Sequence, residues 1–327
     1  MKSIEGRKSI KMDNIMLSIY VTTYNHENYI KQALDSIFSQ VTEYSYEVLV
    51  GEDCSTDNTR QVLKQYEIEH PDYVAMNKLK IFYRDHNMYK ECPSNSFDLK
   101  MRCKGKYVIA LEGDDYWIDC SKIQRQIDFL EKNSDYIAVA HNCIVVDENG
   151  EKKFENYPEC KDSVYITQHY MKGILPGQLA TVMYRNIYHS NTIDLSIFNK
   201  GLMPGDRILY LVLLMNGKMY CMQEAMSAYR HITSHGSSFS ATFKYDFAYE
   251  ELWNRELLLY IKAGYYSYLS IGEDLYTRCI LRGIKGGQCS IKEALEYSKN
   301  LDHRVKSLFR WVIYKIKKIL VFKDNIR

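Results

Sequence analysis

The stretch "YEVLVGEDCSTDNT" (Tyr46–Thr59) joins an apolar run, one glycine and a loop rich in acids and hydroxyls. The apolar run predicts a buried β-strand, and the polar residues predict a loop beyond that strand's carboxyl end. Loops that bind phosphate after a strand usually offer glycine N–H groups and a lysine. Here Glu52, Asp53 and Asp57 precede the first cation, Arg60. Carboxylates accept hydrogen bonds, so this loop suits the base N–H or the ribose hydroxyls of a nucleotide.

The surrounding sequence alternates between strand and helix patterns. Continuous apolar strands between amphipathic helices predict a Rossmann-like α/β fold, with a mostly parallel sheet and helices on both faces. In such sheets ligands bind beyond the carboxyl ends of the strands. The expected strands are 17–23, 46–51, 79–84, 107–113 and 136–141, and the expected helices are 30–38, 59–70 and 122–133.

A second acidic cluster, "ALEGDDYW" (Ala110–Trp117), follows another predicted strand. Alternate residues of an extended chain point the same way, so Glu112 and Asp114 can face one ion. Mg²⁺ or Mn²⁺ would take one or two carboxylate oxygens together with water and the phosphates of a ligand. Asp115 adds a third carboxylate, and a cation would relieve the repulsion among the three. We expect this cluster and Asp53 to share one edge of the sheet.

Both acidic loops also have plainer interpretations. Ser55, Thr56 and Asp57 are residue types that cap helices, and the second cluster is also compatible with an acidic turn before a helix. Capping does not account for Glu52 and Asp53 at the strand tip. A calcium-binding helix–loop–helix is excluded, because the sixth position of "DCSTDNTRQVLK" is asparagine and the twelfth is lysine.

Composition limits the class of protein. The chain has 327 residues, 46% hydrophobic and 26% charged, with a formal net charge of +2, so no global field favours nucleic acid. Its nine cysteines lack CxxC spacing, which favours reduced thiols in a cytoplasmic protein over a disulfide framework. No apolar run is long enough to span a bilayer. We expect a cytoplasmic protein, at most peripheral on the inner face of the cell membrane.

Three blocks in order resemble family-two glycosyltransferases of the GT-A fold. They are "VTTYNHENYIKQALDSIFSQ", "VLVGEDCSTDNT" and "GKYVIALEGDDYWIDCSKIQRQIDFLE", and the resemblance covers roughly residues 18–142. It implies metal-dependent, inverting transfer of a sugar, a hexose or N-acetylhexosamine, from a nucleotide diphosphate to an acceptor hydroxyl. UDP is the nucleotide most often used. The setting it implies is assembly of bacterial cell-surface polysaccharide, lipopolysaccharide or glycoconjugate, with a saccharide or lipid-linked saccharide as acceptor.

The resemblance also assigns roles to residues of the nucleotide-binding half. It implies that the first block wraps the base and that Asp53 meets the uracil N–H, with Glu52 in place of the usual aspartate and Cys54 in place of a small residue. The metal-binding DxD motif reads Glu112-Gly113-Asp114, with Asp115 as a second candidate for the metal or the ribose. The resemblance implies that the residues of the first block that contact the base are Thr22, Thr23 and Tyr24.

The second half carries fewer signals. The resemblance places the catalytic base at Asp206, which opens a predicted helix after "PG"; the plainer interpretation is a helix cap. His231 is a candidate metal ligand, and Arg230 and His235 are candidate diphosphate contacts as charge builds on the leaving group. Arg185 is a candidate contact for an anionic acceptor.

We expect an N-terminal arm (1–14), a glycosyltransferase domain (15–240) and a helical C-terminal region (241–327). The domain divides into a nucleotide-binding half (15–145) and an acceptor half (146–240). The basic, aromatic-rich segment 304–323 fits either an anionic membrane surface or a helix that covers the core with its lysines extended into water.

The sequence is also compatible with two other functions. A sugar-nucleotidyltransferase should carry a loop rich in glycine and basic residues after its first strand, where this chain has "TTYNHEN". A non-catalytic nucleotide-sugar-binding or scaffold protein would keep Asp53 but would not need Asp206.

Overall fold

The computed structural model describes residues 15–89, 91, 93–153, 157, 160–200, 205–232, 245–306, 309 and 312–313. The chain divides into two compact units, one of residues 1–195 with 209–241 and one of 196–208 with 242–327. The predicted arm (1–14) and most of the predicted tail segment (304–323) lie outside the described residues.

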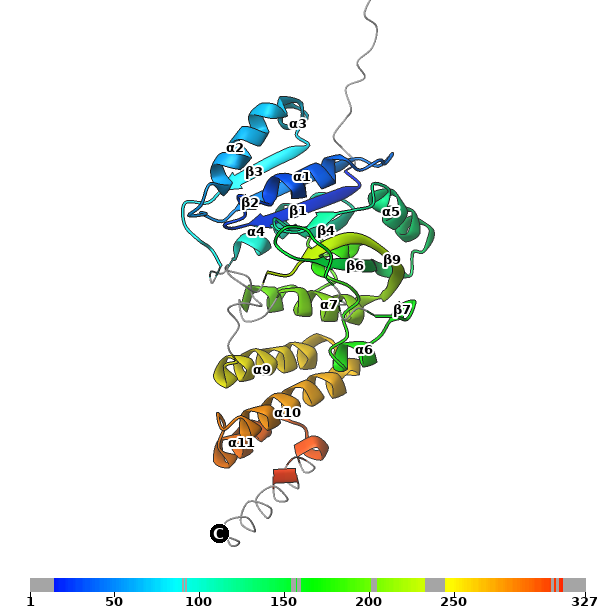
Figure 1. Cartoon of the computed structure of the whole chain (residues 1–327). Helices are drawn as coiled ribbons and strands as arrows, with labels where there is room; N and C mark the ends of the chain where they lie inside the picture. Colours follow the sequence, from blue (N-terminus) through cyan, green and yellow to red (C-terminus); the bar gives the residue numbers. More distant parts are fainter. Residues whose placement is uncertain are drawn as a thin grey trace, which may run out of the picture. The chain divides into compact units, whose positions relative to one another are not determined.

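The first unit is a sheet flanked by helices (Figure 1). Its strands are β1 (Leu17–Thr23), β2 (Tyr46–Glu52), β3 (Leu79–Tyr83), β4 (Tyr107–Glu112), β5 (Tyr116–Trp117), β6 (Tyr136–Val146), β7 (Val164–Tyr165), β8 (Met183–Arg185) and β9 (Lys218–Arg230). Its α-helices are α1 (Ile30–Phe38), α2 (Thr59–Glu69), α3 (Pro71–Ala75), α4 (Asn95–Arg102), α5 (Lys122–Lys132) and α6 (Thr167–Met171), with a 3₁₀ turn η1 (Leu179–Thr181).

The strand order is β3-β2-β1-β4-β8-β6-β9-β5, and β7 pairs with β9. β1, β2, β3 and β4 pair in parallel, as do β6 and β9, whereas β8 runs antiparallel to both β4 and β6. The predicted mostly parallel sheet with flanking helices is therefore confirmed. β6 extends five residues beyond its predicted end, because it continues along β9 through irregular pairing.

Buried apolar strands and helix stripes form the core of this unit. β1 and β2 are buried along almost their whole length, as expected for strands covered on both faces. α1 buries a stripe at helical spacing against them, made of Ile30, Ala33, Leu34 and Ile37. The helix therefore fixes the loop that joins it to the tip of β1.

The second unit is helical. It contains α9 (Phe247–Gly264), α10 (Leu269–Lys285) and α11 (Ile291–Tyr297), the 3₁₀ turns η2 (Ser196–Lys200), η3 (Tyr266–Tyr268) and η4 (Ser298–Asn300), and the first residues of α7 (Gly205–Asn216). α9 and α10 share a core that includes Phe247, Leu258, Tyr276 and Ile280. None of the helices in the described part of the chain has both the length and the apolarity to cross a membrane.

The glycine of the opening stretch has a packing reason. Asn95 is buried against the β2 backbone, where its amide donates to the Gly51 carbonyl at 3.0 Å. A Cβ at Gly51 would lie 2.3 Å from Asn95 Oδ1. A glycine inside a strand often marks such a close approach.

We therefore predict that Gly51→Ala lowers the free energy of unfolding by about 1–3 kcal/mol, because the added methyl displaces a buried, hydrogen-bonded amide. Urea denaturation followed by circular dichroism measures the change. Gly264→Ala is the matched control, because a Cβ there meets no atom within 4 Å. Equal midpoints for the two variants would contradict the packing argument.

Candidate active site

The two acidic clusters meet at one edge of the sheet. In the register of the parallel strands, Thr22 lies between Gly51 of β2 and Glu112 of β4, and Thr23 lies opposite Glu52. The loops after β1, β2 and β4 therefore leave the sheet side by side. This is the carboxyl edge, where ligands bind in open α/β sheets.

The loops after β1 and β2 are held together by reciprocal hydrogen bonds. Asn25 N donates to Ser55 Oγ at 3.0 Å, and its side-chain oxygen accepts from Thr56 N at 2.8 Å. Glu27 binds Asn58 N in the same way, at 2.9 Å. Further bonds join Glu27 N to Asp57 and His26 N to Thr59. The first two sequence blocks thus form one continuous platform.

One residue of this platform has an uncommon backbone conformation. Cys54 has φ +58°, in the left-handed region that favours glycine. Glycine adopts this conformation without strain, and the family that the sequence resembles commonly has glycine or another small residue here. Asn25, in the facing loop, has the same φ.

Glu52 turns inward. Its side chain is fully buried, with one oxygen accepting from Ser55 N at 2.6 Å and the other from Arg60 Nε at 2.6 Å. These bonds tie the loop to the start of α2. Glu52, a predicted nucleotide-binding residue, therefore stabilises the loop, because both of its carboxylate oxygens accept hydrogen bonds from the protein.

Asp53 lies at the tip itself. Its Oδ1 accepts from Met88 N at 2.8 Å, and its backbone N donates to the Thr23 carbonyl at 3.0 Å. Burial raises the pKa of Asp53, while the bond from Met88 and the charge of Arg84 oppose that rise. Among the described residues its Oδ2 has no hydrogen-bond donor, which leaves it able to accept one from a ligand.

The second cluster divides into inner and outer acids. Asp115 is 2% exposed and accepts from Arg230 N at 2.8 Å and from Gln178 Nε2 at 2.7 Å. The same Gln178 nitrogen donates to Glu112 at 3.0 Å. Burial, with the charges of Asp114 and Glu112, raises the pKa of Asp115 well above its usual range. The outer acid is Asp114, whose side chain is 19% exposed.

Asp114 faces His26 from the first loop, with Oδ2 and Nε2 3.8 Å apart. Gly113 permits this approach, because a Cβ there would lie 2.8 Å from both His26 Nδ1 and Thr23 Oγ1. Those two buried atoms have no hydrogen-bond partner among the described residues. Buried polar atoms without a protein partner call for an explanation, and a bound ligand is one.

The residues at this edge fit a hard divalent cation. Carboxylates suit Mg²⁺ or Mn²⁺, although the oxygens of the described residues at this edge do not form a group of three protein ligands within reach of one ion. The group that does so in the described part of the chain is Cys160, Asp162 and His169. An ion held by one or two carboxylates and completed by water and ligand oxygens needs no such cage. Asp114 is the best placed of the acids to hold it.

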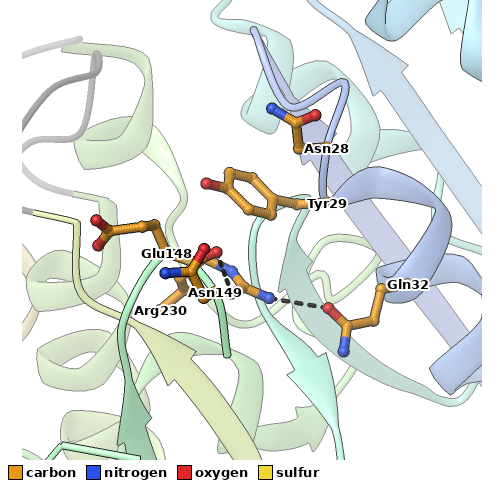
Figure 2. A pocket seen from close by; sticks show the side chains of 6 residues that line it. All are labelled: Asn28, Tyr29, Gln32, Glu148, Asn149 and Arg230. Atoms are coloured by element: carbon orange, nitrogen blue, oxygen red, sulfur yellow. Dashed lines mark hydrogen bonds between the residues drawn. The ribbon is translucent and has the colours of Figure 1, made fainter. Parts of the chain in front are cut away.

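Arg230, at the end of β9, is buried and hydrogen-bonds to several neighbouring segments (Figure 2). Its Nε donates to the Asp114 carbonyl at 2.9 Å, and its terminal nitrogens reach Gln32 and the carbonyls of Asp147 and Glu148. Its guanidinium also lies over the Tyr29 ring. These bonds use most of its N–H donors. In this structure Arg230 therefore holds the surrounding loops together, and few of its donors remain for the predicted diphosphate contact.

A hollow of about 340 Å³ lies beside this arginine. Figure 2 shows Asn28, Tyr29 and Gln32 on one side of it, with Glu148 and Asn149 on the other. Amides, a carboxylate and a tyrosine are groups that bind sugar hydroxyls and rings. The hollow adjoins the acidic edge through the Arg230–Asp114 bond.

Not every predicted site residue lies here. Arg185 pairs with Tyr107 at the start of β4, the end opposite Glu112, and its guanidinium binds the carbonyls of Leu130, Asn133 and Tyr136. The structure thus separates Arg185 from the acidic edge. His231 follows Arg230, with its N–H bound to Val146 and its ring stacked on Tyr229.

Two further predictions concern residues elsewhere. Asp206 lies in the first turn of α7, partly buried, in the segment that belongs to the second unit. Its carboxylate accepts from Arg207 N at 2.7 Å. His235 lies outside the described residues.

Sequence reasoning missed Gln178 and His26. Gln178 lies in the stretch "LPGQLATVMYRN", and its buried amide bridges two acids that precede it by more than sixty residues. No local pattern identifies such a contact. His26 stands in the first block, far from Asp114 in the sequence, and only the parallel pairing of β1 with β4 brings the two together.

Comparison with known proteins agrees with this geometry. The model of glycosyl transferase family 2 matches residues 18–184. TuaG of Bacillus subtilis, named for teichuronic acid biosynthesis, is 28% identical over 261 residues, which cover 76% of this chain and 91% of TuaG. Rv1520 of Mycobacterium tuberculosis is 28% identical over 226 residues, covering 69% of this chain and 61% of the relative. The chain therefore spans less than two thirds of that relative's length.

Among solved structures, that of S. aureus TarS 1–349 in complex with UDP-GlcNAc matches with a TM-score of 0.63 at 16% identity, covering 90% of this chain and 83% of TarS. The likeness confirms the predicted GT-A fold. Since the family model spans more than half of the sequence, the chain belongs to glycosyl transferase family 2.

Proposed function

We propose that this protein transfers a hexosyl or N-acetylhexosaminyl group from a UDP-sugar to an acceptor hydroxyl, with inversion and with the help of a divalent cation. The observation that carries the proposal is the meeting of Asp53 and Asp114 at one sheet edge, on either side of the β1 tip. One acid suits the base, and the other suits the cation that accompanies the diphosphate.

The nucleotide would lie across the joined loops. Thr22, Thr23 and Tyr24 would border the base, and Asp53 Oδ2 would accept the uracil N–H. Glu112 and Gly113 would lie along the ribose. The unpartnered Thr23 hydroxyl supports a ligand here, because a buried hydroxyl without a partner is costly. The TarS structure contains UDP-GlcNAc, and its fold likeness supports the same class of donor.

The cation would be Mn²⁺ or Mg²⁺, held by Asp114. When bound, it would offset negative charge on the departing diphosphate. His26 faces the same carboxylate, and Asp115, anchored by Gln178 and Arg230, fixes the backbone that presents it. His231 remains a proposed neighbour of the cation through its place after Arg230.

Asp206 is the proposed base. Its carboxylate would take the proton of the acceptor hydroxyl as that oxygen attacks the anomeric carbon. The new carbon–oxygen bond forms on the face opposite the leaving group, and the electron pair of the broken bond departs with UDP. One displacement of this kind inverts the anomeric centre.

The acceptor is proposed to be a saccharide, free or lipid-linked, in cell-surface polysaccharide or glycoconjugate assembly. The proposed acceptor-binding site is the hollow lined by Asn28, Tyr29, Glu148 and Asn149. This hollow adjoins the backbone of Asp114 and offers groups that bind sugars. TuaG's name, with its teichuronic acid, supports a polysaccharide setting.

Replacing the proposed base tests the chemistry. We expect Asp206→Asn to lower kcat by about 10²–10⁴-fold, the contribution typical of a general base, and to leave UDP affinity unchanged. Release of UDP measures turnover, and calorimetry measures binding. Asp194→Asn, which changes an exposed acid, is the matched control. Unchanged turnover in Asp206→Asn would eliminate the base assignment, and an inactive wild type would favour a binding protein.

Replacing the proposed base-binding acid tests donor recognition. We expect Asp53→Ala to weaken UDP binding by about tenfold, the equivalent of about 1.4 kcal/mol. Because burial raises the pKa of Asp53, wild-type affinity should begin to fall at a higher pH on acidification than an ordinary aspartate would require. Asp72→Asn, on the exposed surface of α3, should bind like the wild type. Equal affinity for UDP and CDP would count against a uracil contact.

Removing the cation tests the acidic edge. We expect a chelator to suppress turnover and Mn²⁺ to restore it, because the diphosphate's charge would otherwise lack a counter-ion. Asp114→Asn should lower kcat by about two orders of magnitude, as losing one charge-stabilising group does elsewhere. A chelated enzyme with full activity would show that the acids serve another purpose.

A further inference from the structure

A mixed cluster of sulfur, nitrogen and oxygen donors lies outside the site just described. Cys160 Sγ lies 3.6 Å from His169 Nδ1, and His169 Nε2 lies 2.7 Å from Asp162 Oδ2. Each residue offers one ligand atom within 4.8 Å of the others. Cys160 and Asp162 precede β7, and His169 lies in α6. We call these three residues the Cys-His-Asp cluster.

The hydrogen bonds fix the state of the imidazole. Ile166 N donates to His169 Nδ1 at 3.2 Å, and a backbone N–H can only donate. Nδ1 therefore carries the lone pair, and Nε2 carries the proton that it donates to Asp162. This is the tautomer that a metal-binding histidine needs when Nδ1 is the ligand. Cys160 Sγ also lies within 3.6 Å of this nitrogen.

The spacing matches a tetrahedral metal. With metal–sulfur and metal–nitrogen bonds of about 2.3 and 2.0–2.1 Å, two ligands of a tetrahedral zinc lie roughly 3.5–3.6 Å apart. Cys160 Sγ and His169 Nδ1 have that separation. The Asp162 side chain is 72% exposed, so its carboxylate can turn from Nε2 to an ion at Nδ1. Sulfur, imidazole and carboxylate together suit Zn²⁺ better than the hard cations.

We propose that the Cys-His-Asp cluster is a zinc site, with Cys160 Sγ, His169 Nδ1 and an Asp162 oxygen as ligands and water in the fourth position. Binding releases the Cys160 thiol proton to solvent, involves no change of oxidation state, and replaces the weak bond from Ile166 N. The exposed Asp162 provides the way in for the ion. The buried thiol of Cys221 lies close to that of Cys160.

A nucleophilic thiol is a poorer interpretation of the same triad. The Cys160 residue is 1% exposed, so no substrate carbon can reach its sulfur, and burial raises the pKa of its thiol. A metal needs only the sulfur's inner face. The burial that disfavours catalysis therefore suits coordination.

The site would brace a segment that reaches the acidic edge. Cys160 N donates to the Leu175 carbonyl at 2.7 Å, and Cys221 Sγ to the Pro176 carbonyl at 3.5 Å. Two residues further along is Gln178, which bridges Glu112 and Asp115. An ion at the Cys-His-Asp cluster would thus restrict the motion of the segment 175–178, which carries Gln178.

Zinc titration of the untagged, full-length, reduced protein tests the proposal. After treatment with a chelator, competition against a chromophoric chelator should give one Zn²⁺ per chain, and Co²⁺ should show a thiolate charge-transfer band. Cys160→Ser and His169→Ala should lose the site, and Asp162→Asn should bind at least about tenfold more weakly.

Matched variants separate this site from other causes. Cys289→Ser changes a buried cysteine elsewhere and should keep full binding, and Asp114→Asn should keep it too, since the acidic edge is not the zinc site. Circular dichroism checks that each variant folds. The proposal fails if the reduced wild type binds no zinc, or if folded Cys160→Ser and His169→Ala bind it normally.

Discussion

The parallel pairing of β1 with β2 on one side and β4 on the other is the constraint on which the site depends. This register fixes Thr22 between Gly51 and Glu112, and it delivers two acidic loops to one edge. A slip of one residue would exchange the side chains that β1 presents to its two faces, both of which are packed. The apolar strands that define the core therefore also define where the carboxylates meet.

Several acids at one edge repel one another, and the acids of each cluster have different hydrogen-bond partners. In each cluster one acid is occupied by the chain's own donors: Glu52 by Ser55 and Arg60, and Asp115 by Gln178 and Arg230. The neighbouring acid keeps a place at the tip or toward solvent. The inner acids hold the loops, and the outer acids are the proposed ligand contacts.

Much of this arrangement follows from local sequence. Continuous apolar runs predicted the strands, helical spacing predicted α1 and α5, and the position of acids after strands predicted the shared edge. The contacts that the sequence did not reveal are long-range ones. Asp115 meets Arg230 across more than a hundred residues, and Arg185 lies at the far end of β4 because β8 runs antiparallel to it. Residue type alone suggested that both arginines face a ligand, whereas the sheet topology decides what they touch.

The most direct test of the account is a crystal structure of the protein with UDP and Mn²⁺, using the anomalous signal of manganese to locate the ion. We predict that the uracil N–H lies on Asp53, the ribose along Glu112 and Gly113, and manganese between Asp114 and the diphosphate. Nucleotide bound away from the joined loops, or manganese bound away from Asp114, would contradict it.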